Sequence, residues 1–170
     1  MLGNAAGRSI TYDPRMSGVY FYPDTKSNWV TAYANLNTSF EADGIMGLDA
    51  RALFYYNAGG VTPAMATTHV GLGSDYALAF LVEIDQPFDG SKTYKLHLPP
   101  NVPVNNFWAV TLYDTQTRTQ LQTSQLFPTV GSQSEGMQQN ADGSYDVYFA
   151  PQAPEGQQGN WLQTNTGKSW

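Results

Sequence analysis

A group of side chains that could carry chemistry lies between Lys92 and Arg118. The candidates are Lys95, His97, Trp108, Tyr113, Asp114 and Arg118. Because a carboxylate and an imidazole are common general acid–base groups, we predict Asp114 and His97 as the catalytic pair. A guanidinium can hold a carboxylate or phosphate through two parallel hydrogen bonds. The predicted ligand-binding residues are Arg118, Tyr113, Lys95 and Trp108.

Each candidate also has a structural interpretation, which the sequence alone leaves open. Lys95 and His97 lie two positions apart, so both could simply form the solvated outer face of one strand. Asp114 could cap the turn that follows it through backbone hydrogen bonds and pair with Arg118. Aromatic side chains could form a surface for sugar stacking, although core packing is their more common use in a β-sandwich. These aromatic residues are Trp108, Tyr113, Tyr145 and Tyr148.

The sequence predicts no metal-binding residues. His69 and His97 are the only histidines, and a metal site usually needs two or three converging ligands. Oxygen-bearing side chains between Asn140 and Asp146 suggest calcium ligands, but their spacing does not fit an EF-hand and a strand follows at once. We therefore predict a hairpin turn there. A divalent cation that assists a hydrolytic site is left open as a cofactor.

Composition narrows the class of protein. The chain has 170 residues, which predicts a single domain, and only 13% of them are charged. A net charge of −6 argues against a nucleic-acid partner, because phosphate binding needs clustered Lys and Arg. The absence of cysteine excludes disulfides and zinc–thiolate sites. No apolar run reaches the roughly 20 residues that span a bilayer, so we expect a soluble protein, cytoplasmic, periplasmic or secreted.

The elements that must position the candidates are mainly β. Tyr94, Leu96 and Leu98 alternate with polar residues, which predicts a half-buried strand over 92–98. The segment 106–113 is apolar on both faces, which predicts a central strand covered on both sides. Further strands are predicted at 19–23, 76–84, 121–127, 145–149 and 160–164. Helices are predicted at 48–58, before Gly59-Gly60, and at 62–68, whereas 27–36 fits either a helical turn or a strand.

Four motifs carry a family resemblance. They are LDARALFYYNAGGVTPAM (48–65), GLGSDYALAF (71–80), DGSKTYKLHLPPNVPVNNFWAVTLYDTQTR (89–118) and NADGSYDVYFAPQAPEGQQGNWLQT (140–164). The chain resembles the C-terminal part of a bacterial family that pairs two domains of unknown function, numbered 1254 and 1214. The resemblance implies a jelly-roll-like antiparallel β-sandwich over 71–170, with a mixed helical and extended lead-in over 1–70.

The chain departs from the family pattern at both ends. It lacks the large N-terminal domain, and it stops at Trp170, where family members continue through one more strand. A missing strand should leave a sheet edge unpaired, which invites association. Either another chain supplies the strand, the edge is blunted locally, or the sequence is a fragment.

Three functions are compatible with these observations. The first is a non-catalytic module that binds a small molecule or a partner chain. The second is a hydrolase of phosphate esters or glycosides that uses Asp114 with His97 or Asp85, with or without a cation. The third is a structural subunit that forms a homo-oligomer through its sheet edge.

Overall fold

The computed structural model describes residues 5, 28–31, 33, 37–58, 71, 75–82 and 86–170. The chain divides into two compact units, Met1–Phe88 and Asp89–Trp170, and each is described by itself. The strand predicted at 19–23, the helix predicted at 62–68, His69 and Asp85 lie outside the described residues.

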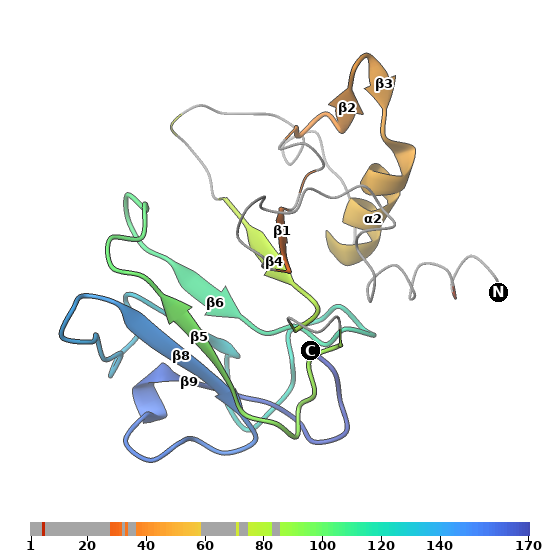
Figure 1. Cartoon of the computed structure of the whole chain (residues 1–170). Helices are drawn as coiled ribbons and strands as arrows, with labels where there is room; N and C mark the ends of the chain where they lie inside the picture. The colour runs from red at the N-terminus through yellow and green to blue at the C-terminus, as the bar shows by residue number, and fades with distance from the viewer. Residues whose placement is uncertain are drawn as a thin grey trace. The chain divides into compact units, whose positions relative to one another are not determined.

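The described part of the first unit contains short strands and helix α2 (Figure 1). Strand β1 (Trp29–Thr31) pairs antiparallel with β4 (Ala77–Ala79), and β2 (Glu41–Ala42) pairs antiparallel with β3 (Ile45–Met46). Asp43 and Gly44 both have positive φ, as a tight hairpin turn requires. Helix α2 follows over Leu48–Ala58. Its aromatic side chain Phe54 packs on Phe40 and Tyr33, and these rings belong to one buried cluster among the described residues of this unit.

The second unit contains the larger core and the candidate residues. Strands β5 (Tyr94–Leu98), β8 (Tyr145–Ala150) and β9 (Trp161–Gln163) form one sheet in that order. The β5–β8 pair is antiparallel and the β8–β9 pair is parallel. Strand β6 (Ala109–Thr111) pairs antiparallel with β7 (Thr129–Gly131), and a 3₁₀ turn, η3 (Gln158–Asn160), precedes β9. The buried cluster comprises Leu112, Leu121, Val130, Val147, Phe149 and Leu162.

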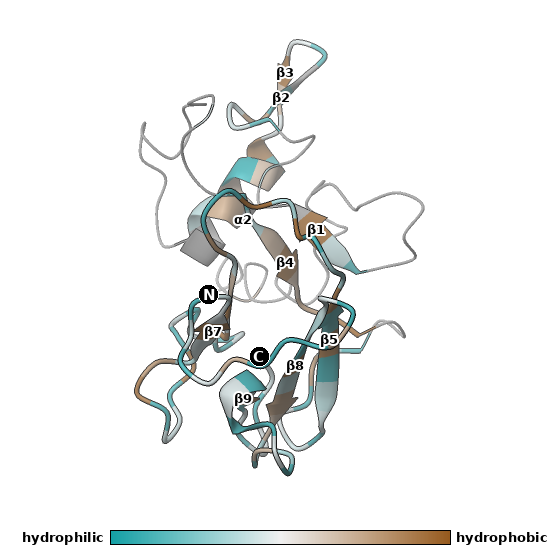
Figure 2. Cartoon of the chain, turned by 90° about the vertical axis from the view of Figure 1, so that its left-hand side faces the viewer, coloured by the Kyte–Doolittle hydropathy of each residue, from teal (hydrophilic) through white to brown (hydrophobic). Residues whose placement is uncertain are grey.

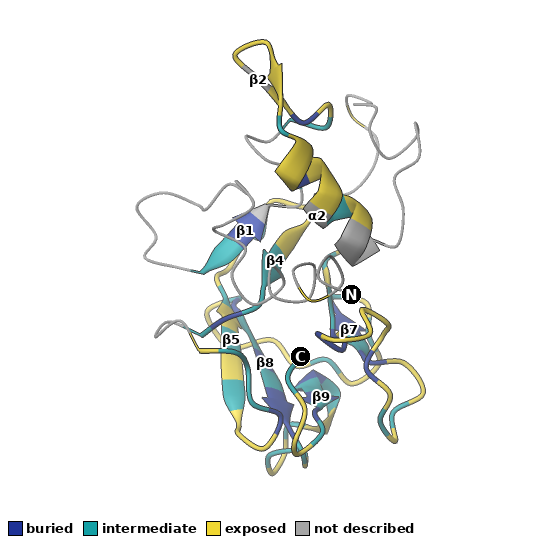
Figure 3. Cartoon of the chain, turned by 90° about the vertical axis from the view of Figure 1, so that its right-hand side faces the viewer, coloured by how far each residue is buried: buried dark blue, intermediate teal, exposed yellow. Residues whose placement is uncertain are grey.

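The burial pattern shows why β5 and β8 form. Along β5, hydrophilic and hydrophobic residues alternate (Figure 2). Exposed and half-buried positions alternate in the same rhythm, whereas β8 and β9 carry fully buried residues (Figure 3). The sheet therefore has one face on the core and one face away from it.

The structure confirms the mainly β class, the helix at 48–58 and the strands within 92–98, 145–149 and 160–164. The ambiguous segment 27–36 contains a strand, and the run 76–84 contains only the short β4. The jelly-roll connectivity and the single-domain organisation stay predictions.

Two predicted strands are wrong. The segment 106–113 is not a covered central strand, because only β6 forms there and it pairs with a single neighbour, β7. Its alternate residues Trp108, Val110 and Leu112 pack in the core, but Ala109 and Tyr113 are exposed. The segment 121–127 is not a strand; it is an irregular chain in which only Leu121 is fully buried.

Candidate functional site

The candidate site is the outer face of the β5–β8–β9 sheet. The strand register places His97 opposite Asp146 and Lys95 opposite Tyr148. Tyr148 is in turn opposite Trp161 on the far side of β8. Because paired residues in a sheet project to the same side, these five side chains share one face. The intervening residues of β8 and β9 belong to the buried cluster.

Asp146 is the centre of the polar part of this face. Its Oδ1 lies 2.7 Å from His97 Nδ1, and its Oδ2 lies 3.4 Å from Lys95 Nζ. The hydrogen bond from His97 lowers the pKa of the Asp146 carboxyl below 3.8; slight burial opposes this shift, and Lys95 adds to it. The side chains of Lys95 and His97 are 51% and 53% exposed, against 18% for Asp146. The side chains of Lys95 and His97 therefore reach solvent while sharing one carboxylate.

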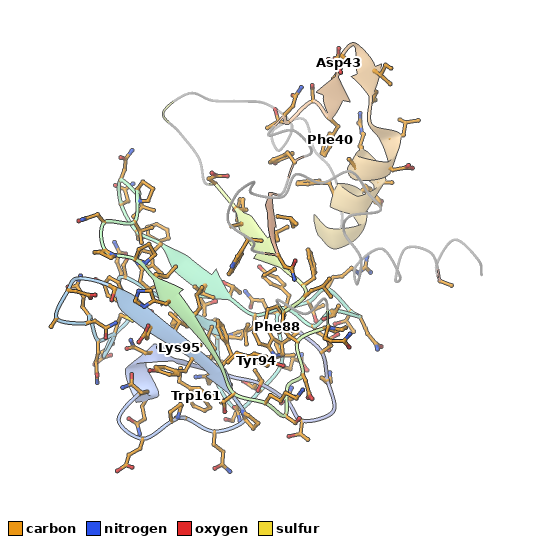
Figure 4. All side chains as sticks on the ribbon, in the orientation of Figure 1. Phe40, Asp43, Phe88, Tyr94, Lys95 and Trp161 are labelled. Atoms are coloured by element: carbon orange, nitrogen blue, oxygen red, sulfur yellow. The ribbon has the colours of Figure 1, made fainter. Side chains whose placement is uncertain are left out.

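An aromatic row crosses the sheet beside this cluster. Tyr148 and Trp161 are both half-buried, and the Trp161 indole N–H donates to the Ala150 carbonyl at 2.9 Å. That hydrogen bond fixes the orientation of the indole ring on the sheet. Lys95 and Trp161 extend from the two outer strands of the same sheet (Figure 4). Aromatic and charged side chains thus lie on one side of the sheet.

The buried side-chain amide of Asn160 holds the backbone of β8 at Asp146 through a hydrogen bond. Asn160 is only 2% exposed, and its side-chain nitrogen donates to the carbonyls of Asp146 (2.9 Å) and Gln138 (2.8 Å). Its side-chain oxygen accepts from the Gln138 N–H at 2.7 Å. Gly159, the preceding residue, packs so closely on the Gly136 backbone that no Cβ would fit there. The backbone of Asp146 is therefore fixed without using its carboxylate.

The predicted turn before β8 forms and is closed by its own hydrogen bonds, but it is not a hairpin, because β8 pairs with β5 and β9 and not with the segment before the turn. Asp142 Oδ1 accepts from the Ser144 N–H at 3.0 Å and from the Ser144 hydroxyl at 2.6 Å. These bonds lower the pKa of the Asp142 carboxyl. The Asn140 N–H donates to the Ser144 carbonyl, and Gly143 takes a positive φ. Among the described residues no three His, Asp or Glu side chains are grouped so as to hold a metal ion.

Asp114 lies in a different environment from the one expected of a catalytic base. It is 7% exposed, and its Oδ1 accepts the backbone N–H groups of Gln116 and Thr117, each at 2.9 Å. Its Oδ2 accepts from Lys168 Nζ at 2.8 Å. Burial raises the pKa of the Asp114 carboxyl, but the bonds from Lys168 and the turn outweigh it, so that the pKa is lowered overall. Both carboxylate oxygens are thus engaged within the fold.

The other predicted site residues are distributed around that turn and the core. Arg118 has a positive φ, and its backbone N–H donates to the Asp114 carbonyl at 2.7 Å. Lys168, rather than Arg118, is the cation paired with the Asp114 carboxylate. Tyr113 is exposed, whereas Trp108 packs edge-on against Tyr145 with ring centroids 5.1 Å apart.

The structure places Lys95 and His97 side by side, as their spacing on one strand predicts. Both contact Asp146. The sequence offered Tyr148 as a sugar-stacking residue and Asp146 as a calcium ligand, but core packing and a turn were preferred there, and Trp161 was not considered. The alternation in YDVYF does place Asp146 and Tyr148 on one face, and that signal was available in the sequence. The sequence does not show the register between β5 and β8, which pairs Asp146 with His97.

Comparison with known proteins identifies the family. The family described as "Protein of unknown function (DUF1214)" matches residues 73–170. The chain belongs to this family. The outer sheet face lies within the DUF1214 part of the chain, and pairing with the domain numbered 1254 stays a prediction.

The crystal structure of the VPA0106 protein from Vibrio parahaemolyticus is similar to part of the chain. The two share 26% identity with a TM-score of 0.45, over 53% of this chain and 22% of that protein. A comparison with curated proteins finds no match. Within the described segments, no helix has the length and apolar character to cross a membrane.

Proposed function

We propose that the DUF1214 part of the chain is a non-catalytic module that binds a small, neutral, polyhydroxylated ligand, such as a sugar. The proposed binding surface is the outer face of the β5–β8–β9 sheet. The observation that carries the proposal is the solvent-facing group of Lys95, His97 and Asp146 beside the aromatic row of Tyr148 and Trp161.

The charge balance of the face favours a neutral ligand. Asp146 offsets the positive charge of Lys95 and accepts a hydrogen bond from His97, which leaves little net attraction for an anion. The chain as a whole carries a charge of −6, which also disfavours anionic ligands. Neutral hydroxyl groups can both accept from the Lys95 ammonium and exchange hydrogen bonds with the imidazole.

The aromatic row of Tyr148 and Trp161 suits the apolar face of a sugar ring. A sugar ring has an apolar face of C–H groups, and an aromatic ring offers a rigid apolar surface of matching size. The face is an open sheet surface rather than a deep pocket, so it would cover only one side of a ligand. We therefore expect a dissociation constant in the millimolar range, or about −4 kcal/mol of binding free energy.

The hydrolase alternative gains no support from this arrangement. Glycoside hydrolysis needs two carboxyl groups about 5–10 Å apart across the scissile bond. His97 is bound to Asp146, while the Asp114 carboxylate is bound to its own turn and to Lys168. The predicted Asp114–His97 pair is therefore not supported by any hydrogen bond between its two members in the described part of the chain.

The proposal can be tested by amide and indole chemical shifts in a titration with neutral sugars. The probes are glucose, galactose, mannose, maltose and cellobiose, with glucuronate and inorganic phosphate as charged comparisons. We expect one or more neutral sugars to shift the Trp161 indole signal and the β8 amides. Tyr148→Ala should weaken that binding about tenfold, which corresponds to the loss of one stacked ring.

Tyr113→Ala is the matched control, because it removes an exposed tyrosine from outside the face. It should leave the affinity unchanged. The absence of saturable shifts with every neutral sugar, or an equal loss in both variants, would refute the proposal. Release of glucose from maltose or cellobiose would instead favour the hydrolase alternative.

A further inference from the structure

Strand β9 is the last strand of its sheet, and its outward backbone groups face the segment Gln122–Gln125. Leu162 is the central residue of β9, and its neighbours Trp161 and Gln163 direct backbone groups toward that segment. Because N–H and C=O groups alternate between the two sides of a strand, such an edge normally offers hydrogen bonds to another strand.

The side chain of Gln125 occupies both of these hydrogen-bonding positions. Its Nε2 donates to the Trp161 carbonyl at 3.1 Å, and its Oε1 accepts the Gln163 N–H at 2.7 Å. One carboxamide thus binds the carbonyl before Leu162 and the N–H after it. A residue of a parallel neighbouring strand would make the same two bonds, because its peptide groups carry the same donor and acceptor.

The segment is fixed to the edge by side chains. The Gln163 side-chain oxygen accepts from the Ser124 N–H (2.9 Å) and hydroxyl (2.5 Å). The Asn165 side-chain nitrogen donates to the Gln122 carbonyl at 2.7 Å. An open hollow of about 580 Å³ adjoins the segment and is lined by residues 119–126 and Pro128. The Gln122–Gln125 segment therefore covers the edge without extending the sheet.

Charge does not protect this edge. Proteins commonly blunt a sheet edge with Lys, Glu or Pro. Neither the segment 119–134 nor the segment 160–167 contains a charged residue. Hydrogen bonding by the Gln122–Gln125 segment thus shields the edge, and within it Gln125 binds the backbone groups of β9 directly.

We propose that Gln125 is an edge cap: its carboxamide takes the place of a neighbouring strand and prevents a second copy of the chain from pairing along β9. This inference does not depend on the proposed ligand, because the capped edge and the outer face use different atoms of the sheet.

Gln125→Ala tests the cap in the full chain. We expect light scattering coupled to size exclusion to show an average mass above that of the wild type, increasing with protein concentration. Gln122→Ala is the control, since it removes an exposed carboxamide from the same segment but keeps the carbonyl that Asn165 binds. The control should match the wild type in mass at every concentration.

Hydrogen exchange at the Gln163 amide separates a cap from an ordinary structural bond. In dilute Gln125→Ala this amide should exchange about tenfold faster than in the wild type, because it loses its acceptor. At high concentration the amide should regain protection if a second chain pairs there. Gln125→Met keeps the length of the side chain without either bond, and it should behave in the same way if alanine unfolds the chain. Faster exchange at all concentrations, with an unchanged mass in a folded variant, would overturn the proposal.

Discussion

Asp114 and Asp146 each pair with a lysine in the same unit, yet the fold uses them in opposite ways. Asp114 is nearly buried, and its carboxylate holds a turn together through two backbone N–H groups and Lys168. Asp146 is fixed by its backbone carbonyl, which accepts from the buried Asn160. Its carboxylate is left on the outer face with Lys95 and His97.

The difference indicates which of the two carboxylates could form hydrogen bonds with a ligand. A carboxylate that is saturated by backbone donors is committed to the local structure, and a ligand could reach it only by breaking those bonds. A carboxylate that bonds only to exposed, flexible side chains can exchange them for a ligand at small cost. We therefore propose a structural role for Asp114 and a ligand contact for Asp146, and four experiments test this division.

The largest expected effect is at Asn160, behind Asp146. Asn160→Ala would remove a buried amide and leave the Asp146 carbonyl and both backbone groups of Gln138 without this partner. We expect a loss of about 3 kcal/mol of unfolding free energy, measured by urea unfolding followed by tryptophan fluorescence. Asn106→Ala, at an exposed position, should change it by less than about 0.5 kcal/mol. A small effect at Asn160 would mean that the backbone of Asp146 is held by other contacts.

The next effect is at Asp114. Asp114→Ala removes the acceptor of two turn N–H groups and the partner of Lys168, so we expect a loss of about 2 kcal/mol. Asp114→Asn keeps one oxygen for the turn and should lose about half as much. Sugar binding, measured by the same titration as above, should be unchanged in both folded variants. Loss of binding without loss of stability would restore Asp114 as a site residue.

Asp146→Ala should show the reverse pattern. Its ion pairs are with side chains that are about half exposed, so the unfolding free energy should fall by less than about 1 kcal/mol. Binding of a neutral sugar should weaken about tenfold, because the ligand loses an acceptor and Lys95 loses its counter-charge. Lys95→Met should weaken binding less, since it removes only one donor. If Asp146→Ala destabilises the chain as much as Asp114→Ala, the division between the two residues is wrong.

Local signals in the sequence predicted much of the fold. The helix Leu48–Ala58 stops before two glycines, and β8 follows a turn rich in Asn, Asp and Gly, so both elements were placed closely. The prediction of a covered central strand at 106–113 was wrong, because an apolar pattern does not show which side chains pack against another part of the protein. Ala109 and Tyr113 are apolar or aromatic but exposed. They made both faces of the segment look apolar in the sequence, although only one face packs in the core.

The site was harder to predict than the fold. The predicted turn-capping alternative for Asp114 depends on neighbours two and three residues away, which the sequence displays. The partners of His97 and Gln125 are 49 and about 37 residues away and depend on strand register. Register across such separations is set by tertiary packing, so neither the Asp146 cluster nor the edge cap could be read from spacing.

The smallest expected effect is a difference in acid sensitivity between the two aspartates. Both carboxyl groups have a pKa below the ordinary 3.8 in the folded chain, so each stabilises the fold above that pH. This stability is lost as the pH falls through 3.8 toward the lower folded pKa. Urea midpoints measured between pH 5 and pH 3 should therefore decrease for the wild type, and the decrease should be smaller in Asp114→Asn. Asp146→Asn should change the decrease less, because exposed ion pairs are screened by solvent and salt. An equal change in the two variants would show that Asp146 is as much a part of the folded framework as Asp114.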